Sequence, residues 1–428
     1  MNISIYIIKY TKYIIRVTRD FFKEFCQKFF NNSTKLQKEY LTWVFQRNQK
    51  FSEDFVKSSI DNISQSNVKT KLITFYLPQF YENEINNENF GKGFMEWYNT
   101  TKAIPQFLGH NQPQLPIDVG FYNLSNDDIM YRQIELAKKY GIYGFCFYYY
   151  WFSGDRLLEK PLDNFLKNRD LNMPFCLFWA NETWTRLWGD GNHRKVIKKQ
   201  ELKENDEKLF IEDIIKYFQD SRYIKIGNKP LLIIYKTEIF EKGKFIDFIN
   251  TIKSEVKKHG FQDIFILTTD CGFGKIDAFQ YNLDGIVEFT HRDIVEKPIF
   301  YNMKNKYINP NFKGRVYDIK KSLLKNKHIQ DSEQNIYKCV TAGWDNTARK
   351  AYSGAEVFQM SPADYKKWLK DVIIWTKKCE YNSNQFVFID SWNEWAEGAH
   401  LEPDQHYGYA YLQATKEVLE ETACYPNK

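Results

Sequence analysis

"FVFIDSWNEWAEGAHLEPD", residues 386–404, begins as an apolar run and ends in carboxylates, tryptophans, an asparagine and a histidine. Seven earlier runs are also apolar and rich in β-branched and aromatic residues: 71–78, 143–150, 174–181, 230–235, 264–269, 285–289 and 337–343. Strands buried on both faces of a parallel sheet have this near-continuous apolar pattern. Eight such strands over roughly 350 residues, with helices between them, predict an α/β fold, a (β/α)8 TIM barrel with long loop insertions.

The segments between several of these runs have the apolar spacing of amphipathic helices: 125–141, 205–219, 244–260 and 361–379. The first begins in Asn and Asp and ends at Gly141, a residue suited to a helix C-cap. A doubly wound open sheet is the alternative fold. It is disfavoured because "CGFGK" at 271–275 lacks the GxGxxG continuation of a phosphate loop. Long insertions at 79–125 and 290–335 are expected to decorate the face with the active site.

The barrel is expected to occupy residues 69–428 and to follow an N-terminal extension, 1–68, formed by a helix and a polar linker. Within 1–30, apolar residues recur near heptad spacing with Lys and Arg between them, which predicts a basic amphipathic helix. These charges, and the lack of a small-residue cleavage site, argue against a secretory signal or a spanning helix. The helix is expected to pack on its own domain or a partner, or alternatively to lie on the inner membrane of a cytoplasmic protein.

The composition excludes several classes of function. The net charge of +6 comes from scattered lysines, so nucleic-acid binding is not implied. The 7 cysteines occur singly, without a CxxC pair, which indicates reduced thiols. The histidines lack metal-binding spacing, so a metal hydrolase is not expected, and the missing GxSxG argues against a hydrolase nucleophile elbow. We expect no cofactor. The aromatic share of 18% is high, and Tyr and Trp suit sugar rings.

Polar and aromatic residues gather after the predicted strands, as expected for a barrel enzyme. Carboxylates with interleaved Trp and Asn indicate a cleft for a neutral polyhydroxylated ligand, an oligosaccharide or polysaccharide. The carboxylates available there are Glu96, Glu182, Glu288, Asp345, Glu394 and Glu397. The predicted substrate-binding residues are Glu96, Trp97, Tyr149, Trp151, Asn181, Glu182, Trp184, Trp344, Asp345, Asn346, Trp392, Asn393, Trp395 and His400.

Glu394 and Glu397 are the candidate catalytic residues. In a helical turn, side chains three residues apart share one face. Glycosidic-bond chemistry uses two carboxyls that flank the bond, and closely placed carboxyls raise one pKa so that an acid stands beside a base. The alternative is a solvated pair of surface glutamates, against which Trp392 and Trp395 and the position after an apolar strand argue. Glu402 is expected to have a supporting role.

Six long motifs carry a resemblance to a known family: "FYLPQF", "GKGFMEWYNTTKA", "GIYGFCFYYYWFSGDRLLEKPLDNFL", "FCLFWANETWTRLW", "GWDNTAR" and "SWNEWAEGAHLEPDQHYGYAYLQA". From about Lys71 to about Glu420 the chain resembles the WbsX-type protein family, which shares a domain with glycoside hydrolase family 99. The resemblance implies a TIM barrel and a place in bacterial O-antigen or capsule biosynthesis. It also implies that Glu394 is a base acting on the substrate 2-hydroxyl and that Glu397 is the acid/base. Ala396 departs from the hydrolases, which typically have His there.

Three hypotheses of function follow. The first is an enzyme that makes or breaks glycosidic bonds by retaining chemistry, either as a glycosyltransferase or as an endo-acting, mannosidase-type hydrolase. The second is a non-catalytic carbohydrate-binding barrel. The third, which depends only on residues 1–30, is a membrane-associated scaffold in a polysaccharide complex.

Overall fold

The computed structural model describes residues 35–46, 51–64, 68–186, 195–270, 276–288, 307–324, 329, 334–350 and 354–425. The chain forms two compact units. The smaller unit takes its residues from 1–51, 105–110 and 302–312, and the larger unit takes its residues from 52–104, 111–301 and 313–428. The amphipathic helix predicted for 1–30 lies outside the described residues.

In the smaller unit, residues 35–46 form a helix. The backbone N–H of Gln106 donates to Nδ1 of His110 at 3.0 Å, and the ring of His110 stacks on Phe107. No helix among the described residues is long and apolar enough to cross a membrane. All features of the candidate site belong to the larger unit.

The larger unit is built on a parallel sheet. Its main path runs through β12 (Ile336–Tyr337), β10 (Gly285–Val287), β9 (Phe265–Thr269), β8 (Lys229–Ile234), β4 (Phe175–Trp179), β2 (Ile142–Phe152), β1 (Lys71–Tyr76), β16 (Phe386–Asp390) and β13 (Cys339–Thr341). Every pair of neighbours on this path is parallel. The eight apolar runs all coincide with strands of this sheet, and the predicted TIM-barrel class is confirmed.

The two ends of this path are joined by the chain itself. β12 and β13 are separated only by Lys338, so the run predicted as one strand at 337–343 is two short strands. The Lys338 ammonium forms a buried ion pair with Glu288 at 2.9 Å. Because β12 pairs with β10 and β13 pairs with β16, this interrupted seventh strand closes the ring. An open doubly wound sheet is therefore excluded.

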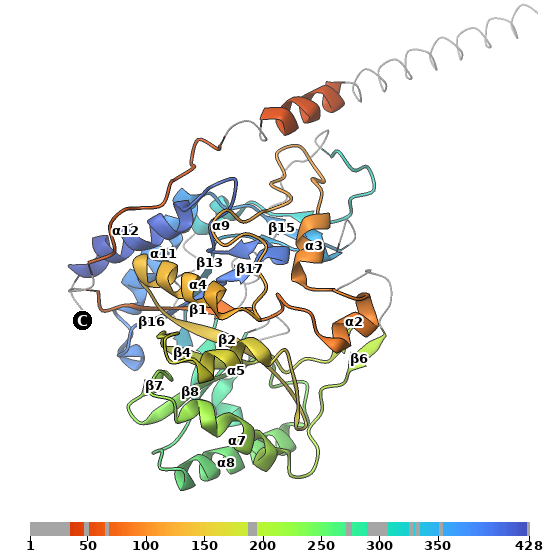
Figure 1. Ribbon diagram of the computed structural model, residues 1–428. Helices are drawn as coiled ribbons and strands as arrows, with labels where there is room; N and C mark the ends of the chain where they lie inside the picture. Colours follow the sequence, from red (N-terminus) through yellow and green to blue (C-terminus); the bar gives the residue numbers. More distant parts are fainter. Residues whose placement is uncertain are drawn as a thin grey trace, which may run out of the picture. The chain divides into compact units, whose positions relative to one another are not determined.

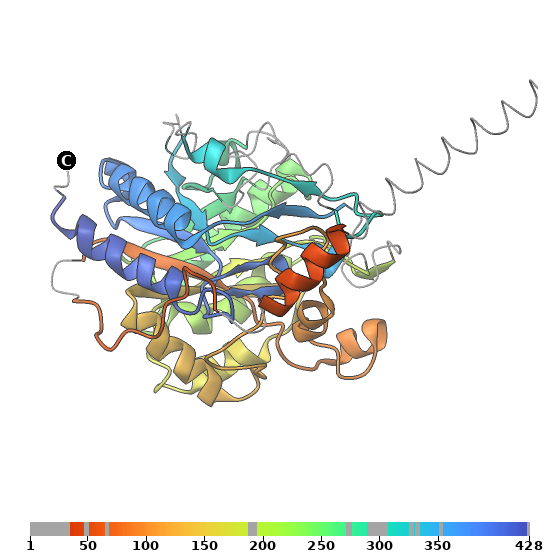
Figure 2. The same cartoon turned by 90° about the horizontal axis from the view of Figure 1, so that it is seen from above.

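Helices lie along the strands and beyond their ends (Figures 1 and 2). They are α2 (Glu84–Phe90), α3 (Glu96–Lys102), α4 (Asp127–Lys139), α5 (Lys160–Lys167), α7 (Asp206–Phe218), α8 (Lys242–Lys258), α9 (Ile319–Leu324), α10 (Thr347–Lys350), α11 (Pro362–Thr376) and α12 (Ala410–Ala423). The four predicted helices correspond to α4, α7, α8 and α11. As expected, Asn126 caps the start of α4 through its side chain, and Gly141 follows its end with a φ of +88°.

Short strands and 3-10 turns decorate this frame. They are β3 (Asp155–Leu157), β5 (Trp184–Thr185), β6 (Val196–Lys198), β7 (Lys225–Ile226), β11 (Arg315–Val316), β14 (Trp344–Asp345), β15 (Glu356–Phe358), β17 (Asn393–Glu394), β18 (Ala399–His400), η2 (Ala278–Tyr281), η4 (Glu380–Asn382) and η5 (Trp395–Glu397). Because the main strands are parallel, their C-terminal ends meet at one end of the barrel, where TIM-barrel active sites lie.

Candidate active site

A cavity of about 350 Å³ lies at the C-terminal ends of the strands. Its lining residues end or follow β1, β2, β4, β8 and β16, or come from α2, α3, α10 and the β5–β6 hairpin. They include Leu77, Gln79, Phe94, Glu96, Tyr148, Tyr150, Phe178, Glu182, Trp184, Tyr235, Lys236, Trp344, Asn346, Arg349, Lys350, Asp390, Glu394 and Glu397. The size is within the range of small-molecule and sugar sites.

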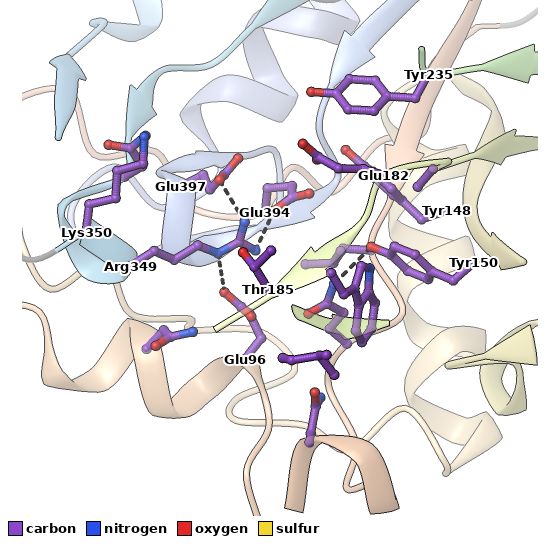
Figure 3. A pocket seen from close by; sticks show the side chains of 18 of the residues that line it. Glu96, Tyr148, Tyr150, Glu182, Thr185, Tyr235, Arg349, Lys350, Glu394 and Glu397 are labelled. Atoms are coloured by element: carbon purple, nitrogen blue, oxygen red, sulfur yellow. Dashed lines mark hydrogen bonds and ion pairs between the residues drawn. The ribbon is translucent and has the colours of Figure 1, made fainter. Parts of the chain in front are cut away.

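Arg349 is the centre of the charged part of the cavity. Its Nε donates to Glu96 Oε1 at 2.8 Å, one terminal nitrogen donates to Glu397 Oε1 at 2.7 Å, and the other donates to Glu394 Oε2 at 3.1 Å. Figure 3 shows these three contacts converging on one guanidinium. The carboxyls come from α3, after strand one, and from the segment after strand eight, so Arg349 ties together chain segments far apart in sequence.

The local fold after β16 places both candidate glutamates on the cavity. Glu394 ends β17, Glu397 ends the single 3-10 turn η5, and β17 then pairs antiparallel with β18. Gly398 turns the chain between them with a φ of +62°. A Cβ on Gly398 would lie 2.9 Å from the Cβ of Asp345, so this turn requires glycine. The predicted sharing of one face by the i,i+3 pair is thereby achieved in a 3-10 turn.

Glu402 anchors this turn from behind. Its carboxylate accepts hydrogen bonds from Trp395 Nε1 at 2.7 Å, the Tyr122 hydroxyl at 2.8 Å and Gln133 Nε2 at 2.6 Å. Burial raises the pKa of Glu402 to about 7, and these donors oppose the rise. Because Trp395 stands between the two candidate glutamates in sequence, the carboxylate of Glu402 fixes the turn that carries them.

Replacing Glu402 with Leu is expected to lower the free energy of unfolding by about 3 kcal/mol, because three buried donors lose their acceptor. Urea denaturation checks this value. Glu420→Leu, at an exposed position of α12, is the matched control and should change stability little. Equal unfolding midpoints for Glu402→Leu and the control would contradict the anchoring role.

The candidate pair is protonated more readily than free glutamates. Burial raises the pKa of Glu394 to about 8; Arg349 opposes the rise, and the Glu397 and Glu96 carboxyls add to it. Burial also raises the pKa of Glu397, again against Arg349. A carboxyl whose pKa is raised in this way can keep its proton near neutral pH, as the acid in glycosidic chemistry must.

The opposite wall is aromatic. Tyr148 and Tyr150 of β2 point into the cavity, and the Tyr150 ring lies edge-on to Trp184 with centroids 5.1 Å apart. Beyond them, the Lys236 ammonium pairs with Glu182 at 2.7 Å. An aromatic wall facing a carboxyl cluster offers apolar ring faces to sugar C–H groups and acceptors to sugar hydroxyls.

The predicted site residues divide into two groups. Those that line the cavity are Glu96, Glu182, Trp184, Trp344, Asn346, Glu394 and Glu397. Those that do not line it are Trp97, Tyr149, Trp151, Asn181, Asp345, Trp392, Asn393, Trp395 and His400. Glu288, which pairs with Lys338, also lies outside the lining.

Several of the second group support the cavity from behind. The side-chain amide of Asn393 accepts a hydrogen bond from the backbone N–H of Leu77 at 2.8 Å and donates one to its carbonyl at 3.0 Å. The side chain of Asn181 forms the same two kinds of bond with the backbone of Lys236. The ring of His400 stacks on Trp395, and burial lowers the pKa of His400 to about 4. His400 is therefore a neutral, structural side chain and not a cavity residue.

The prediction that Tyr149 and Trp151 lie at the substrate site is wrong, because neither side chain lines the cavity. Side chains alternate along a strand, so with Tyr148 and Tyr150 inside the barrel, Tyr149 and Trp151 point outward. The Tyr149 hydroxyl donates to Asp213 of α7, and the Trp151 ring packs in the layer between the barrel and that helix. The aromatic residues of β2 that line the cavity are therefore Tyr148 and Tyr150, the sequence neighbours of Tyr149 and Trp151.

Matched Tyr→Phe substitutions test this correction. Tyr148→Phe removes a cavity hydroxyl that favours the charged form of Glu394, and is expected to lower the rate on a bound glycan about tenfold. Tyr149→Phe loses only the bond to Asp213, and is expected to cost about 1 kcal/mol of stability and leave the rate unchanged. Steady-state rates and urea denaturation of both variants provide the measurements, and the reverse pattern would restore the original prediction.

Arg349, Tyr148, Tyr150, Lys236 and Asp390 are cavity residues that the sequence did not single out. Arg349 lies in "GWDNTAR", one of the motifs that carry the family resemblance. The sequence alone does not indicate a role for its basic side chain, because its three acidic partners are distant in sequence. Among the residues that the structure describes, no group of His, Cys, Asp and Glu has the arrangement of a metal site.

Fold and cavity together define a TIM-barrel protein with an acidic, aromatic site at the C-terminal end of its strands. The Glycosyltransferase WbsX family matches residues 72–415. The chain belongs to this family. It is 36% identical over 348 residues to a protein named Uncharacterized protein WxcX from Xanthomonas campestris pv. campestris strain B100, and equally similar to its counterpart in strain ATCC 33913.

These alignments cover 81% of this chain and 49% of each relative, so the chain spans about half the length of the curated relatives it matches. Among solved structures, the GH99 endo-alpha-mannosidase from Bacteroides thetaiotaomicron is 14% identical with a TM-score of 0.50, covering 82% of this chain and 96% of that one. A structure titled Glycoside hydrolase-like protein is 15% identical with a TM-score of 0.51, covering 86% and 98%. These likenesses establish the fold.

Proposed function

We propose that the protein is an enzyme that makes or breaks glycosidic bonds in a bacterial surface polysaccharide. The observation that carries this proposal is the pair Glu394 and Glu397, buried together on the cavity and held by the terminal nitrogens of one guanidinium. A shared guanidinium keeps the two carboxyls near each other, which suits a retaining mechanism better than an inverting one.

The proposed chemistry assigns one role to each carboxyl. Glu394 takes the proton of the substrate 2-hydroxyl, whose oxygen then attacks the anomeric carbon as the glycosidic bond breaks. Glu397 gives its proton to the leaving oxygen. In the second step Glu397 takes a proton from the incoming water or sugar hydroxyl, whose oxygen attacks the anomeric carbon. The bond between that carbon and the 2-oxygen then breaks and Glu394 returns its proton to the 2-oxygen, so the proton count balances. This division of roles follows the family resemblance. Burial raises the pKa of both carboxyls, which supports the presence of a proton on the site near neutral pH.

The charge of the cavity helps to distinguish a nucleotide-sugar transferase from a hydrolase. Among its described lining residues are six carboxyl and three basic side chains. Arg349 and Lys236 already pair with carboxylates, so little positive charge is available for a diphosphate. Phosphate sites use helix N-termini, glycines and free cations. This favours a neutral glycan in the cavity, and makes a family 99-like, endo-acting hydrolase or transglycosylase the second candidate beside a nucleotide-sugar transferase.

The proposed setting is O-antigen or capsule biosynthesis in the cytoplasm, with residues 1–30 as the segment that would contact the inner membrane. The polysaccharide setting follows the family to which the chain belongs, whereas the membrane contact follows the basic amphipathic pattern of residues 1–30. A non-catalytic carbohydrate-binding barrel is disfavoured because binding alone does not require two buried carboxyls with raised pKa values on one guanidinium.

Product masses test the function. The purified protein is incubated with oligosaccharides from the surface polysaccharide of its host, and with α-linked mannose oligosaccharides, each with and without nucleotide sugars. Shorter oligosaccharides without a donor would support hydrolysis, whereas donor-dependent elongation would support transfer. Measurable sugar binding with no change in mass under any condition would overturn the enzyme and leave the binding barrel.

A further inference from the structure

Asp390 is a cavity carboxyl to which neither the proposed mechanism nor the family match gives a role. It ends β16, is 3% exposed and lines the cavity. The cavity residues that surround Asp390 at the ends of the neighbouring strands are apolar or aromatic. We call Leu77, Tyr148, Phe178, Tyr235 and Asp390 the strand floor. Asp390 is therefore the acid in an otherwise apolar and phenolic surface.

The strand floor is packed as a continuous layer. The Tyr148 and Phe178 rings meet edge-on with centroids 5.0 Å apart, and Phe178 meets Tyr235 at 5.6 Å. On the other side of Asp390, Thr341 of β13 is its neighbour in the parallel register. This layer keeps water from the inner side of the Asp390 carboxyl, so its polar atoms are available to the cavity and not to bulk solvent.

Two of the three basic side chains that line the cavity pair with carboxylates other than Asp390. Arg349 pairs with Glu96, Glu394 and Glu397, and Lys236 pairs with Glu182. Within the part of the chain that the structure describes, no lysine or arginine forms an ion pair with Asp390. A buried carboxylate without a counter-ion is strongly disfavoured, so such a group keeps its proton.

The titratable groups that face Asp390 favour the same state. Burial raises the pKa of Asp390 well above its usual range, and the carboxyls of Glu394 and Glu397 add to the rise. The Asp390 carboxyl also interacts electrostatically with the hydroxyl of Tyr148 from β2 and with the thiol of Cys339 from β13. Burial raises the pKa of both of these groups as well, so they stay neutral and supply no positive charge.

We propose that Asp390 is a proton-bearing carboxyl that donates a hydrogen bond to an oxygen of the sugar unit lying on the strand floor. It is a specificity residue: its O–H selects an oxygen acceptor on the glycan. A carboxylate at the same place would select a donor or a cation, such as the ammonium of an amino sugar. The inference rests on the proposed function, since it assumes a glycan in the cavity.

Protonation can be tested without any substrate. Infrared difference spectra at neutral pH compare the wild-type protein with Asp390→Asn, and the C=O stretch of a protonated carboxyl is expected to disappear in the variant. Asp128→Asn, an exposed aspartate of α4, is the matched control and should leave that band unchanged. An unchanged band in Asp390→Asn would mean that Asp390 is ionised, and would overturn the proposal.

Binding tests the role. Fragments of one to six sugars from the host's surface polysaccharide are titrated by calorimetry into wild type, Asp390→Asn and Asp390→Leu. The Leu variant loses the donor and is expected to bind about tenfold more weakly. The Asn variant keeps an amide donor and should stay within about threefold of wild type. Melting temperatures verify folding, and we expect no loss because the substitutions remove an unpaired buried carboxyl.

The binding experiment distinguishes a failure of the role proposed for Asp390 from a failure of the proposed function. If wild type binds the fragments and both variants bind as tightly, Asp390 does not contact the glycan, and the proposal is wrong while the proposed function stands. If no fragment binds to wild type, the proposed function fails, and the role of Asp390 fails with it, even where the infrared band shows a protonated carboxyl.

Discussion

Glu397→Gln and Glu394→Gln are each expected to lower the rate of glycosidic-bond turnover by about 10²–10⁴-fold. Loss of one essential proton-transferring group has effects of this size, because the amide neither gives nor takes the proton in the transition state. Both side chains line the same cavity and contact the same guanidinium, so the two variants should be impaired to similar degrees. Initial rates are measured by mass spectrometry on the most reactive oligosaccharide.

Glu420→Gln, on the exposed face of α12, is the matched control for this substitution and should react like wild type. Thermal melting separates chemistry from folding. Because the pKa of both catalytic candidates is raised by burial, the neutral amide resembles the protonated carboxyl, and neither variant should unfold at lower temperature. Wild-type rates in either Gln variant would rule out the carboxyl pair as the reacting groups.

Arg349→Met is expected to move the pH–rate profile to higher pH and to lower the rate at neutral pH on the order of 10²-fold. The guanidinium lowers the pKa of Glu394 and Glu397 by stabilising their charged forms. Without it both pKa values rise, so at a given pH less of the ionised base is present and the acid limb of the profile moves up. The alkaline limb, set in this mechanism by loss of the proton of the acid Glu397, moves in the same direction because Arg349 also lowers the pKa of Glu397.

Arg349→Lys separates charge from geometry. An ammonium keeps the positive charge but lacks the planar set of nitrogens that reaches Glu96, Glu394 and Glu397 at once. We expect its pH profile to stay near that of wild type while its rate still falls, because the carboxyls are less well placed. An Arg349→Met profile that coincides with wild type would show that Arg349 does not set the protonation of the pair.

The fold could be predicted because its strands carry a strong local signal. A parallel strand covered on both faces must be apolar along its length, and all eight runs met this condition. The break at Lys338 could not be predicted, since "YKCVTAG" reads as one strand. Its buried ammonium pairs with Glu288, which lies 50 residues earlier in the chain, and also lies over the ring of Trp375.

The same apolar continuity explains the error at Tyr149 and Trp151. A strand whose two faces are both buried has no hydrophobic alternation, so "YYYW" does not reveal which aromatics face the cavity. Arg349 was missed for a different reason. Arg349 matters because it binds three carboxyls that the closed barrel brings together. These carboxyls are distant in sequence, so the local sequence "NTARK" does not predict the contacts. Glu394 and Glu397 were predictable because they are close in sequence as well as in space.

The most direct test of the central claim is the configuration of the first product. Wild-type protein reacts with its oligosaccharide in deuterated buffer, and proton NMR follows the anomeric signals before mutarotation. Retaining chemistry by the pair predicts that the new reducing end, or the new glycosidic bond, has the anomeric configuration of the linkage that was cleaved. A first product of inverted configuration, or the same product formed at the same rate by Glu394→Gln and Glu397→Gln, would contradict the account.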